Sequence, residues 1–251
     1  VNDYLAMFDA GTYESINGHT DTFMDATLGL QRSPFPESYK CAETFGNKLV
    51  LGGVRIDGVN RENRLLINAV KVTGSGEAID TPDIQPDQNA IDLDFKIQKI
   101  AKLDDQTAIV IGDTGIGVLD VAGRVFRKMD KHYGTDSPDS VTDLSVGKEG
   151  VGFLFKNKYR LFQGFVDPEI ISEAITRDSE FGSGIGMSTA VAATTDCWAF
   201  YIADSKQLVL IFRASPYPVF VLDMSKPNGG WLHAVWTDQF KCGCNGVDEK
   251  L

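Results

Sequence analysis

The chain has 251 residues, with 24 Lys and Arg against 35 Asp and Glu, which gives a net charge of −11 at pH 7. Hydrophobic residues make up 43% of the sequence, which excludes wholesale disorder and allows one large β domain or two smaller domains. The acidic balance argues against a protein that wraps nucleic acid by neutralising its phosphates. No apolar run approaches the roughly 18–20 residues of a membrane-spanning helix.

Residues 1–39 show weak periodicity and are expected to form an N-terminal arm or a partial domain. From residue 40 onwards, short runs rich in Val, Ile, Phe and Tyr predict β-strands. The runs fall into sets that begin near residues 40, 96, 139, 187 and 231. The strands predicted in the first four sets are Lys40–Thr44, Lys48–Val54 and Arg64–Val72; Lys96–Leu103, Gln106–Gly112, Gly115–Val121 and Arg124–Lys128; Asp139–Val146, Gly150–Phe155 and Lys158–Phe162; and Met187–Thr194, Cys197–Ile202, Gln207–Phe212 and Pro218–Leu222.

Several of these runs are continuously apolar, as in Ala108–Ile111 and Leu208–Phe212. A strand that is apolar on both faces lies between two layers. Sets of short antiparallel strands between such layers describe propeller blades. The sequence therefore predicts an all-β fold, a β-propeller-like stack of short antiparallel blades over residues 40–251. Trp231–Trp236 is expected to open an unfinished fifth set, and a sandwich or barrel is the alternative fold.

Two segments interrupt the strand pattern. Gly74–Asp94 is acidic and is predicted to be an exposed loop or insertion. Its carboxylates lack the spacing of a calcium-binding loop, so a solvated linker is favoured over a cation site. These acidic residues are Glu77, Asp80, Asp83, Asp87, Asp92 and Asp94. The second segment, Asp167–Thr176, is predicted to be a short helix, with Asp167 as its cap and Pro168 in its first turn.

The cysteines are too few for a disulfide scaffold: Cys41, Cys197, Cys242 and Cys244. Cys242 and Cys244 would share one face of an extended segment. As zinc ligands they would need two more donors, from Cys41, Cys197 or His233. His19, His132 and His233 are scattered and form no zinc motif. Reduced structural thiols are therefore favoured, and no metal or cofactor is expected.

Two local patterns are candidates for catalytic or binding sites. The glycine-rich stretch Gly112–Gly117 lies between two predicted strands with no helix after it, which favours a hairpin turn over a phosphate cradle. Asp136 and Asp139 are the best local pair of carboxylates for a glycosidase. They stand in a stretch rich in turn residues, where Asp and Ser ordinarily bond the backbone. The structural interpretation is favoured, and no catalytic residue is assigned.

The clearest positive patch consists of Arg124, Arg127, Lys128, Lys131 and His132. On a strand, Arg124 and Lys128 share a face and Arg127 does not. Given the acidic chain, a solvated face or an interface with an acidic neighbouring subunit is favoured over base readout. The remaining aromatic candidates are expected to pack within blades rather than bind a ligand: Trp198, Trp231, Trp236 and the Tyr217-Pro218 step.

Three groups of passages together resemble a known protein family. The first is Phe45–Gly53 with Asn63–Asn68, where Lys48 stands in place of the family's Arg. The second runs through Ala108–Ile116, His132–Val141, Gly152–Gly164 and Ile170–Ser172, with Lys158 where Gly is commoner. The third comprises Ala199–Ile202, Val219–Met224 and Gly230–Trp231. They resemble the tail nozzle proteins of short-tailed bacteriophages, the group that includes tail tubular protein B and the packaged-DNA stabilisation proteins, and the resemblance covers roughly residues 41–236.

The resemblance implies a non-enzymatic virion protein of the phage tail that forms a homo-oligomeric ring around the DNA exit channel. It implies the portal, its adaptor and other tail proteins as partners, with DNA passing without specific binding and without membrane insertion. The family has no catalytic set, so no site residue is carried over. Two alternatives stay open: an extracellular propeller that binds or cleaves carbohydrate, and a protein-interaction propeller of a cell.

Overall fold

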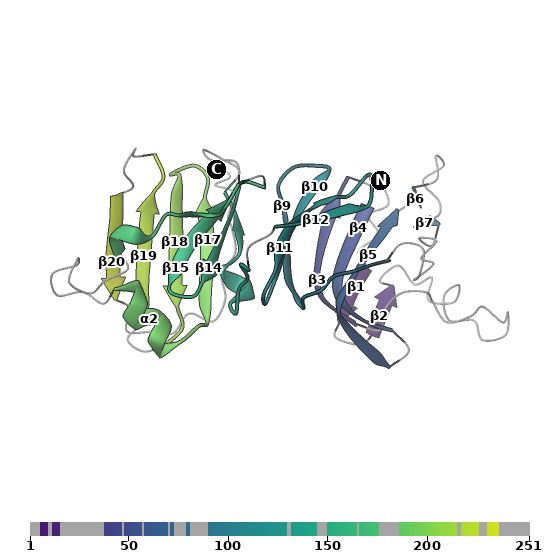
Figure 1. The fold of residues 1–251 in the computed structure, drawn as a ribbon, viewed down its shortest axis with the longest axis horizontal. Helices are drawn as coiled ribbons and strands as arrows, with labels where there is room; N and C mark the ends of the chain where they lie inside the picture. The colour runs from purple at the N-terminus through teal and green to yellow at the C-terminus, as the bar shows by residue number, and fades with distance from the viewer. Residues whose placement is uncertain are drawn as a thin grey trace.

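A computed structural model gives the fold and describes residues 6–9, 12–15, 38–46, 48–56, 58–69, 71–72, 79–80, 90–129, 132–144, 150–164, 166–175, 186–214, 217–225 and 230–235. Within these residues the chain forms antiparallel β-sheets, four of which have four strands each. Figure 1 shows the first two of these sheets in chain order, in blue and teal, in the right half of the molecule and the last two, in green and yellow, in the left half. We call them blades 1 to 4.

Each blade is made of strands that are close in sequence. Blade 1 consists of β3 (Ser38–Phe45), β4 (Lys48–Ile56), β5 (Val59–Ala69) and β8 (Ala90–Asp92). Blade 2 consists of β9 (Ile97–Lys102), β10 (Thr107–Gly112), β11 (Ile116–Asp120) and β12 (Val125–Lys128). Blade 3 consists of β13 (Thr142–Asp143), β14 (Val151–Phe155), β15 (Lys158–Phe162) and β16 (Glu169–Ile170). Blade 4 consists of β17 (Cys197–Ile202), β18 (Gln207–Phe212), β19 (Pro218–Asp223) and β20 (Gly230–Val235).

Short elements complete the described fold. Two small hairpins pair β1 with β2 and β6 with β7. Their strands are β1 (Ala6–Asp9), β2 (Thr12–Ser15), β6 (Lys71–Val72) and β7 (Ile79–Asp80). The helical segments are the 3-10 turns η2 (Pro138–Ser140) and η3 (Glu173–Ile175) and the helix α2 (Met187–Ala193). No helix in the described ranges is long and apolar enough to cross a membrane.

Neighbouring blades pack face to face, and β10 shows why its sequence is continuously apolar. Ala108 and Val110 lie in the core that blade 2 shares with blade 1. Ile109 and Ile111 point to the opposite face and lie in the core shared with blade 3. All four side chains are fully buried. The expected layering of a doubly apolar strand is confirmed, and the all-β, propeller-like architecture with it.

A third core joins blades 3 and 4. Its largest members include Tyr159 from β15 together with Phe212 and Phe220 from blade 4, whose rings pack edge to face with centroids 5.9 Å apart. On the far side of blade 1, Leu51, Val54 and Leu66 form a smaller buried cluster. β3 begins at Ser38, just before the predicted boundary at residue 40, and that domain division stays a prediction.

Two predicted strands are wrong. Met187–Thr194 is the helix α2, whose Met187 and Ala190 are buried three residues apart on one face. Its run of Ala, Ser and Thr lacks the large apolar residues of the true first strand, β17. The described residues of Asp139–Val146, up to residue 144, contain the end of a 3-10 turn and the two-residue strand β13, because Pro138 and Ser140 hold the chain in a turn.

Three further expectations need correction. Asp167–Thr176 forms the short strand β16 and the turn η3 instead of a helix, since its backbone pairs with β15. Trp231–Trp236 does not open a fifth set: Gly230–Val235 is β20, the fourth strand of blade 4, paired along its length with β19. The acidic segment Gly74–Asp94 also contains β7 and β8, and β8 completes blade 1.

Candidate functional site

A shallow groove of about 360 Å³ lies between the outermost strands of blades 1 and 2. Its apolar floor and charged rim consist of Ile91, Asp92, Leu93, Asp94, Arg124, Phe126 and Lys128. These residues come from β8, from the link between β8 and β9, and from β12 with its preceding turn. The groove brings together two segments that the sequence presents separately, the end of the acidic stretch and the basic cluster.

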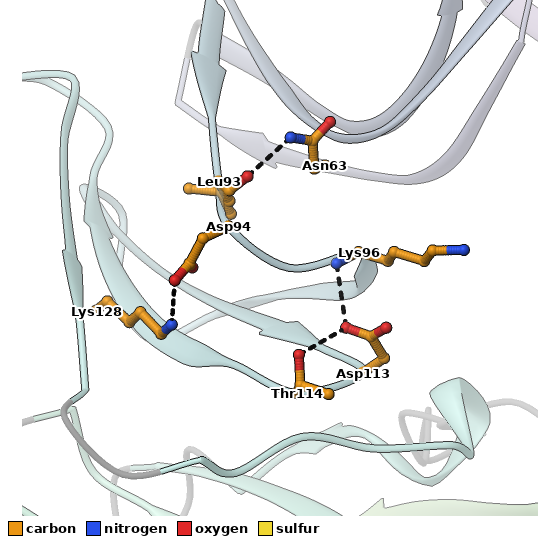
Figure 2. Close-up of polar contacts among 7 residues, drawn as sticks. All are labelled: Asn63, Leu93, Asp94, Lys96, Asp113, Thr114 and Lys128. Atoms are coloured by element: carbon orange, nitrogen blue, oxygen red, sulfur yellow. Dashed lines mark hydrogen bonds and ion pairs between the residues drawn. The ribbon is translucent and has the colours of Figure 1, made fainter.

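The link between the blades is fixed by hydrogen bonds on both sides. The Leu93 N–H donates to the Asn63 carbonyl oxygen at 2.9 Å, and the Asn63 amide donates to the Leu93 carbonyl oxygen at 2.8 Å (Figure 2). On the blade 2 side, Asp113 accepts from the Lys96 N–H at 3.1 Å and from the Thr114 hydroxyl at 3.2 Å. The Asp113 N–H in turn donates to the Lys96 carbonyl oxygen at 3.0 Å. The link therefore holds its shape from both ends.

Both carboxylates of the groove have a cationic partner. Arg64, whose side chain is largely buried, donates two hydrogen bonds of 2.7 Å to Asp92. Lys128 forms an ion pair with Asp94 (Figure 2). Its ammonium also lies 5.7 Å from the centre of the Phe95 ring. Phe95 packs edge to face on Phe126, with ring centroids 6.0 Å apart. Charge and aromatic contacts thus tie β12 to the link between the blades.

These pairs decide what chemistry the groove can perform. The Arg64 hydrogen bonds lower the pKa of Asp92, and the Lys128 hydrogen bond lowers that of Asp94. Both carboxyl groups are therefore ionised at neutral pH. A glycosidase needs one carboxylic acid whose pKa is raised, so that it can protonate the leaving group. The arrangement fits a structural junction between blades better than an acid–base pair.

Replacing Arg64 with Met is expected to cost about 1 kcal/mol of stability at neutral pH, because half of the Asp92 side chain is exposed and solvent screens the pair. Pairing depresses the pKa of Asp92 below its ordinary value of 3.8, so its contribution is present above 3.8 and is lost as pH falls through the lowered pKa. Urea unfolding of both proteins at neutral pH and in a series of acidic buffers measures the difference.

Lys102→Met is the matched control, since its ion pair with Asp105 is exposed and screened by solvent, so its loss should leave stability nearly unchanged. A cost for Arg64→Met that stayed constant down to the most acidic buffer would contradict the assignment to the ion pair.

The basic cluster has Arg124 and Lys128 on one side and Arg127 on the other, as predicted. Arg124 and Lys128 both line the groove, whereas Arg127 does not. In the register of β11 with β12, Arg127 pairs with Val118, a residue packed against the core of blades 2 and 3. His132 is exposed, and Lys131 lies outside the described residues.

The glycine-rich stretch forms the predicted hairpin turn between β10 and β11. The Gly112 N–H donates to the Gly115 carbonyl oxygen at 2.7 Å. The Phe95 ring lies directly on this turn: a Cβ at Gly112 or Gly115 would come within 2.1 or 2.0 Å of a ring carbon. The glycines therefore make room for an aromatic ring of the inter-blade core.

Asp136 and Asp139 are both exposed, while the residues around them are buried and hydrogen-bonded. The Ser137 hydroxyl donates to the Cys197 carbonyl oxygen at 2.9 Å and accepts from the Cys197 N–H at 3.1 Å. The Ser140 hydroxyl donates to the Ser137 carbonyl oxygen at 2.6 Å and accepts from the Leu154 N–H at 3.0 Å. We call Ser137 and Ser140 the hydroxyl staple, because Ser137 ties the turn at the start of blade 3 to blade 4 and Ser140 ties the same turn to β14 of blade 3.

The tryptophans do not form one platform. Trp231 packs on the core between blades 3 and 4, where its indole N–H donates to the Ile171 carbonyl oxygen at 3.2 Å. Trp198 lies on the opposite face of blade 4, where the Arg213 guanidinium stacks 4.4 Å from its ring centre. Tyr217 adopts a left-handed backbone with φ of 53° immediately before β19. Trp236 lies outside the described residues.

The described cysteines are buried free thiols. Burial raises the pKa of Cys41 to about 11 and raises that of Cys197 further, so neither is a reactive thiolate. Within the described ranges, no group of three His, Cys, Asp or Glu side chains could hold a metal ion. Cys242 and Cys244 lie outside those ranges, and so do His19, Glu77, Asp83 and Asp87.

No family model and no curated protein matches the chain. Solved structures with some similarity include two of Hsv2 from Kluyveromyces lactis, at 12% and 10% identity with TM-scores of 0.41 and 0.39. They cover 79% and 78% of this chain, which spans 61% and 59% of theirs. A crystal structure of the tricorn protease covers 78% at 14% identity and a TM-score of 0.40, and the chain spans 17% of it. The four blades, and not these likenesses, establish the propeller-like architecture.

Proposed function

We propose that the chain is a structural, non-enzymatic component of the tail of a short-tailed phage, working in a ring around the DNA exit channel. The observation that carries the proposal is where the resembling passages fall in the fold. Phe45–Gly53 covers the turn into β4, Ala108–Ile116 covers β10 and the turn to β11, and Gly152–Gly164 covers β14 and β15. The passages that resemble nozzle proteins are thus the hairpins from which three successive blades are built.

The passage His132–Val141 supports the same proposal, since its characteristic small residues are the buried ones. Gly134 has no room for a side chain, because a Cβ would lie 2.2 Å from the Asp113 carbonyl oxygen. In the hydroxyl staple, Ser137 bonds Cys197 of blade 4 and Ser140 bonds Leu154 of blade 3. A wall that encloses a channel needs blades that keep their relative positions, and this passage links blades 2, 3 and 4.

The surface charge is compatible with a conduit for DNA. The chain carries −11, and Asp104, Asp120 and Asp136 are exposed at turns. Like charge removes the counterion-release attraction that would hold phosphates on the wall. The purified chain should therefore not retain double-stranded DNA on a filter, even at low salt. Retention that weakens steeply with added salt would contradict this part of the proposal.

Cryo-electron microscopy of tailed particles that contain this chain tests the proposal. We expect its blades in a ring on the axis between portal and tail tip, contacting the portal or its adaptor. A particle labelled with an antibody against the chain gives a second, lower-resolution readout of the same position. Localisation away from that axis, or to a cellular complex without virions, would overturn the proposal.

A further inference from the structure

The outermost strand of blade 2, β12, has one edge that pairs with no other strand of the described ranges. On its other edge it pairs with β11. Directly after β12, the Met129 N–H donates to the Ile116 carbonyl oxygen of β11 at 2.9 Å. Bonded and non-bonded residue pairs alternate along an antiparallel ladder, so Arg127 also bonds β11, whereas Phe126 and Lys128 turn their N–H and C=O groups outward. β12 therefore presents an open row of backbone donors and acceptors.

This open edge borders the groove between blades 1 and 2. Phe126 and Lys128, whose backbone groups point outward, also line the groove with their side chains. Because successive side chains of a strand point to opposite faces, Val125 and Arg127 lie on the other face of β12. Val125 is 47% exposed, and Arg127 is exposed as well. A strand added at this edge would thus meet one apolar residue and one cation on each face.

The edge is cationic in a chain whose net charge is −11. The segment Arg124–Lys128 contains three cations and no carboxylate. Of the two carboxylates that line the groove, Asp94 is paired with Lys128 and the other is bonded by Arg64. None of the ion pairs between described residues includes Arg127. The local charge therefore complements an acidic partner.

The cations also decide which strands the edge can accept. Charged side chains on an edge strand ordinarily prevent indiscriminate pairing with other chains. At β12 they repel a basic strand and attract an acidic one, which makes the edge selective. Asp120 of β11 shares the face of Arg127, but its carboxylate accepts the Gly123 N–H of the turn at 2.9 Å.

We propose that β12 binds an extended acidic segment of a partner protein, which adds a fifth strand to blade 2 and places side chains in the groove of about 360 Å³. Backbone hydrogen bonds hold the segment, the apolar floor of the groove accepts its apolar side chains, and the cations select its carboxylates. A protein strand fits this site better than nucleic acid, because the groups on offer are a backbone ladder and an apolar floor. The inference does not depend on the proposed place of the chain in a phage tail.

Fluorescence anisotropy of a labelled peptide of two Val-Glu-Glu-Val repeats, mixed with the full chain, tests the proposal. We expect saturable binding that Arg127→Glu weakens by at least about tenfold, because the variant places like charges side by side. Lys206→Glu, the same charge reversal at an exposed turn of blade 4, is the matched control and should weaken binding by less than about twofold. A peptide of two Val-Lys-Lys-Val repeats should not bind.

Peptides methylated on backbone nitrogens test strand addition without altering the protein. Along an added strand, alternate N–H groups bond β12 and the others face away from it. Methylating one alternate set should abolish binding, and methylating the other set should leave binding nearly intact. Equal losses from the two sets, or no loss from either, would refute strand addition.

Near-ultraviolet circular dichroism checks that Arg127→Glu is folded, and Arg127→Gln replaces it if it is not. The proposal is overturned if the acidic peptide shows no saturable binding, or if it binds the Arg127 variant as well as the unaltered protein. A labelled DNA duplex that binds more tightly than the peptide, and is released by Arg127→Glu, would assign the cations to phosphates and overturn it too. A dimer in light scattering that Arg127→Glu dissociates would assign the edge to a second copy, with the same consequence.

Discussion

Replacing Tyr159 with Ala is expected to lower the free energy of unfolding by about 3–5 kcal/mol, the range for deleting a large buried aromatic ring. Tyr159 is among the largest fully buried side chains and lies in the core between blades 3 and 4. Its hydroxyl donates to the Ser140 carbonyl oxygen at 2.8 Å, and its ring lies where a Cβ of Gly152 would come within 2.6 Å. Urea unfolding followed by circular dichroism measures the loss.

Tyr159→Phe separates the ring from the hydroxyl. It keeps the packing but leaves the Ser140 carbonyl oxygen without this donor, and should cost about 1–2 kcal/mol. Val166→Ala, at a residue that is 61% exposed, should change stability by less than about 0.5 kcal/mol. If Tyr159→Ala were as mild as Val166→Ala, the core that joins blades 3 and 4 would not exist as described.

Tyr159 also illustrates what the sequence could predict. Its strand was predicted with the correct bounds, because Lys158–Phe162 contains the aromatic residues Tyr159 and Phe162, which favour strands, and follows a turn. The hydrogen bonds that Tyr159 makes could not be predicted, since its partners Ser140 and Ser172 lie in turns elsewhere in the chain. The pattern of apolar residues in a strand predicts which side chains are buried. It does not predict which residues they contact, because those contacts depend on how the blades stack.

Two of the missed strands share one physical cause. β8 and β16 have only three and two residues, too few to show any periodicity. Each exists because an adjacent long strand offers it backbone partners, as Leu65 of β5 does for Ile91 of β8. The helix α2 was missed for the opposite reason, since Val191 and Thr189 favour strands while its tertiary setting favours a helix.

The groove between blades 1 and 2 could be predicted only in its parts. The sequence shows an acidic stretch that ends at Asp94 and a basic cluster that contains Lys128, and their opposite charge was the one available signal of contact. Their meeting depends on the link between β8 and β9, which carries the chain from one blade to the next. The buried Arg64 gave no signal, because nothing in its strand distinguishes it from an exposed arginine.

Gly115→Ala is expected to destabilise the protein by about 1–3 kcal/mol, the usual cost of overpacking a core. The added Cβ would lie 2.0 Å from the Phe95 ring, so the ring or the turn must move. Phe95 is only 4% exposed and is held by Phe126 on one side and by the Lys128 ammonium near its ring. The ring therefore has little freedom to yield.

A double-mutant cycle with Phe95→Leu tests this cause directly. The smaller side chain makes room for the Cβ. The double variant should therefore lose less stability than the sum of the losses in the two single variants, with a coupling of about 1 kcal/mol or more. Gly46→Asn is the control for a glycine in open space: nothing lies within 4 Å of its Cβ position, and Asn tolerates its φ of 58°. Purely additive losses would mean that Gly115→Ala destabilises the turn itself and does not act through the Phe95 ring. The turn between β10 and β11 would then not contribute to the junction of blades 1 and 2 through this contact.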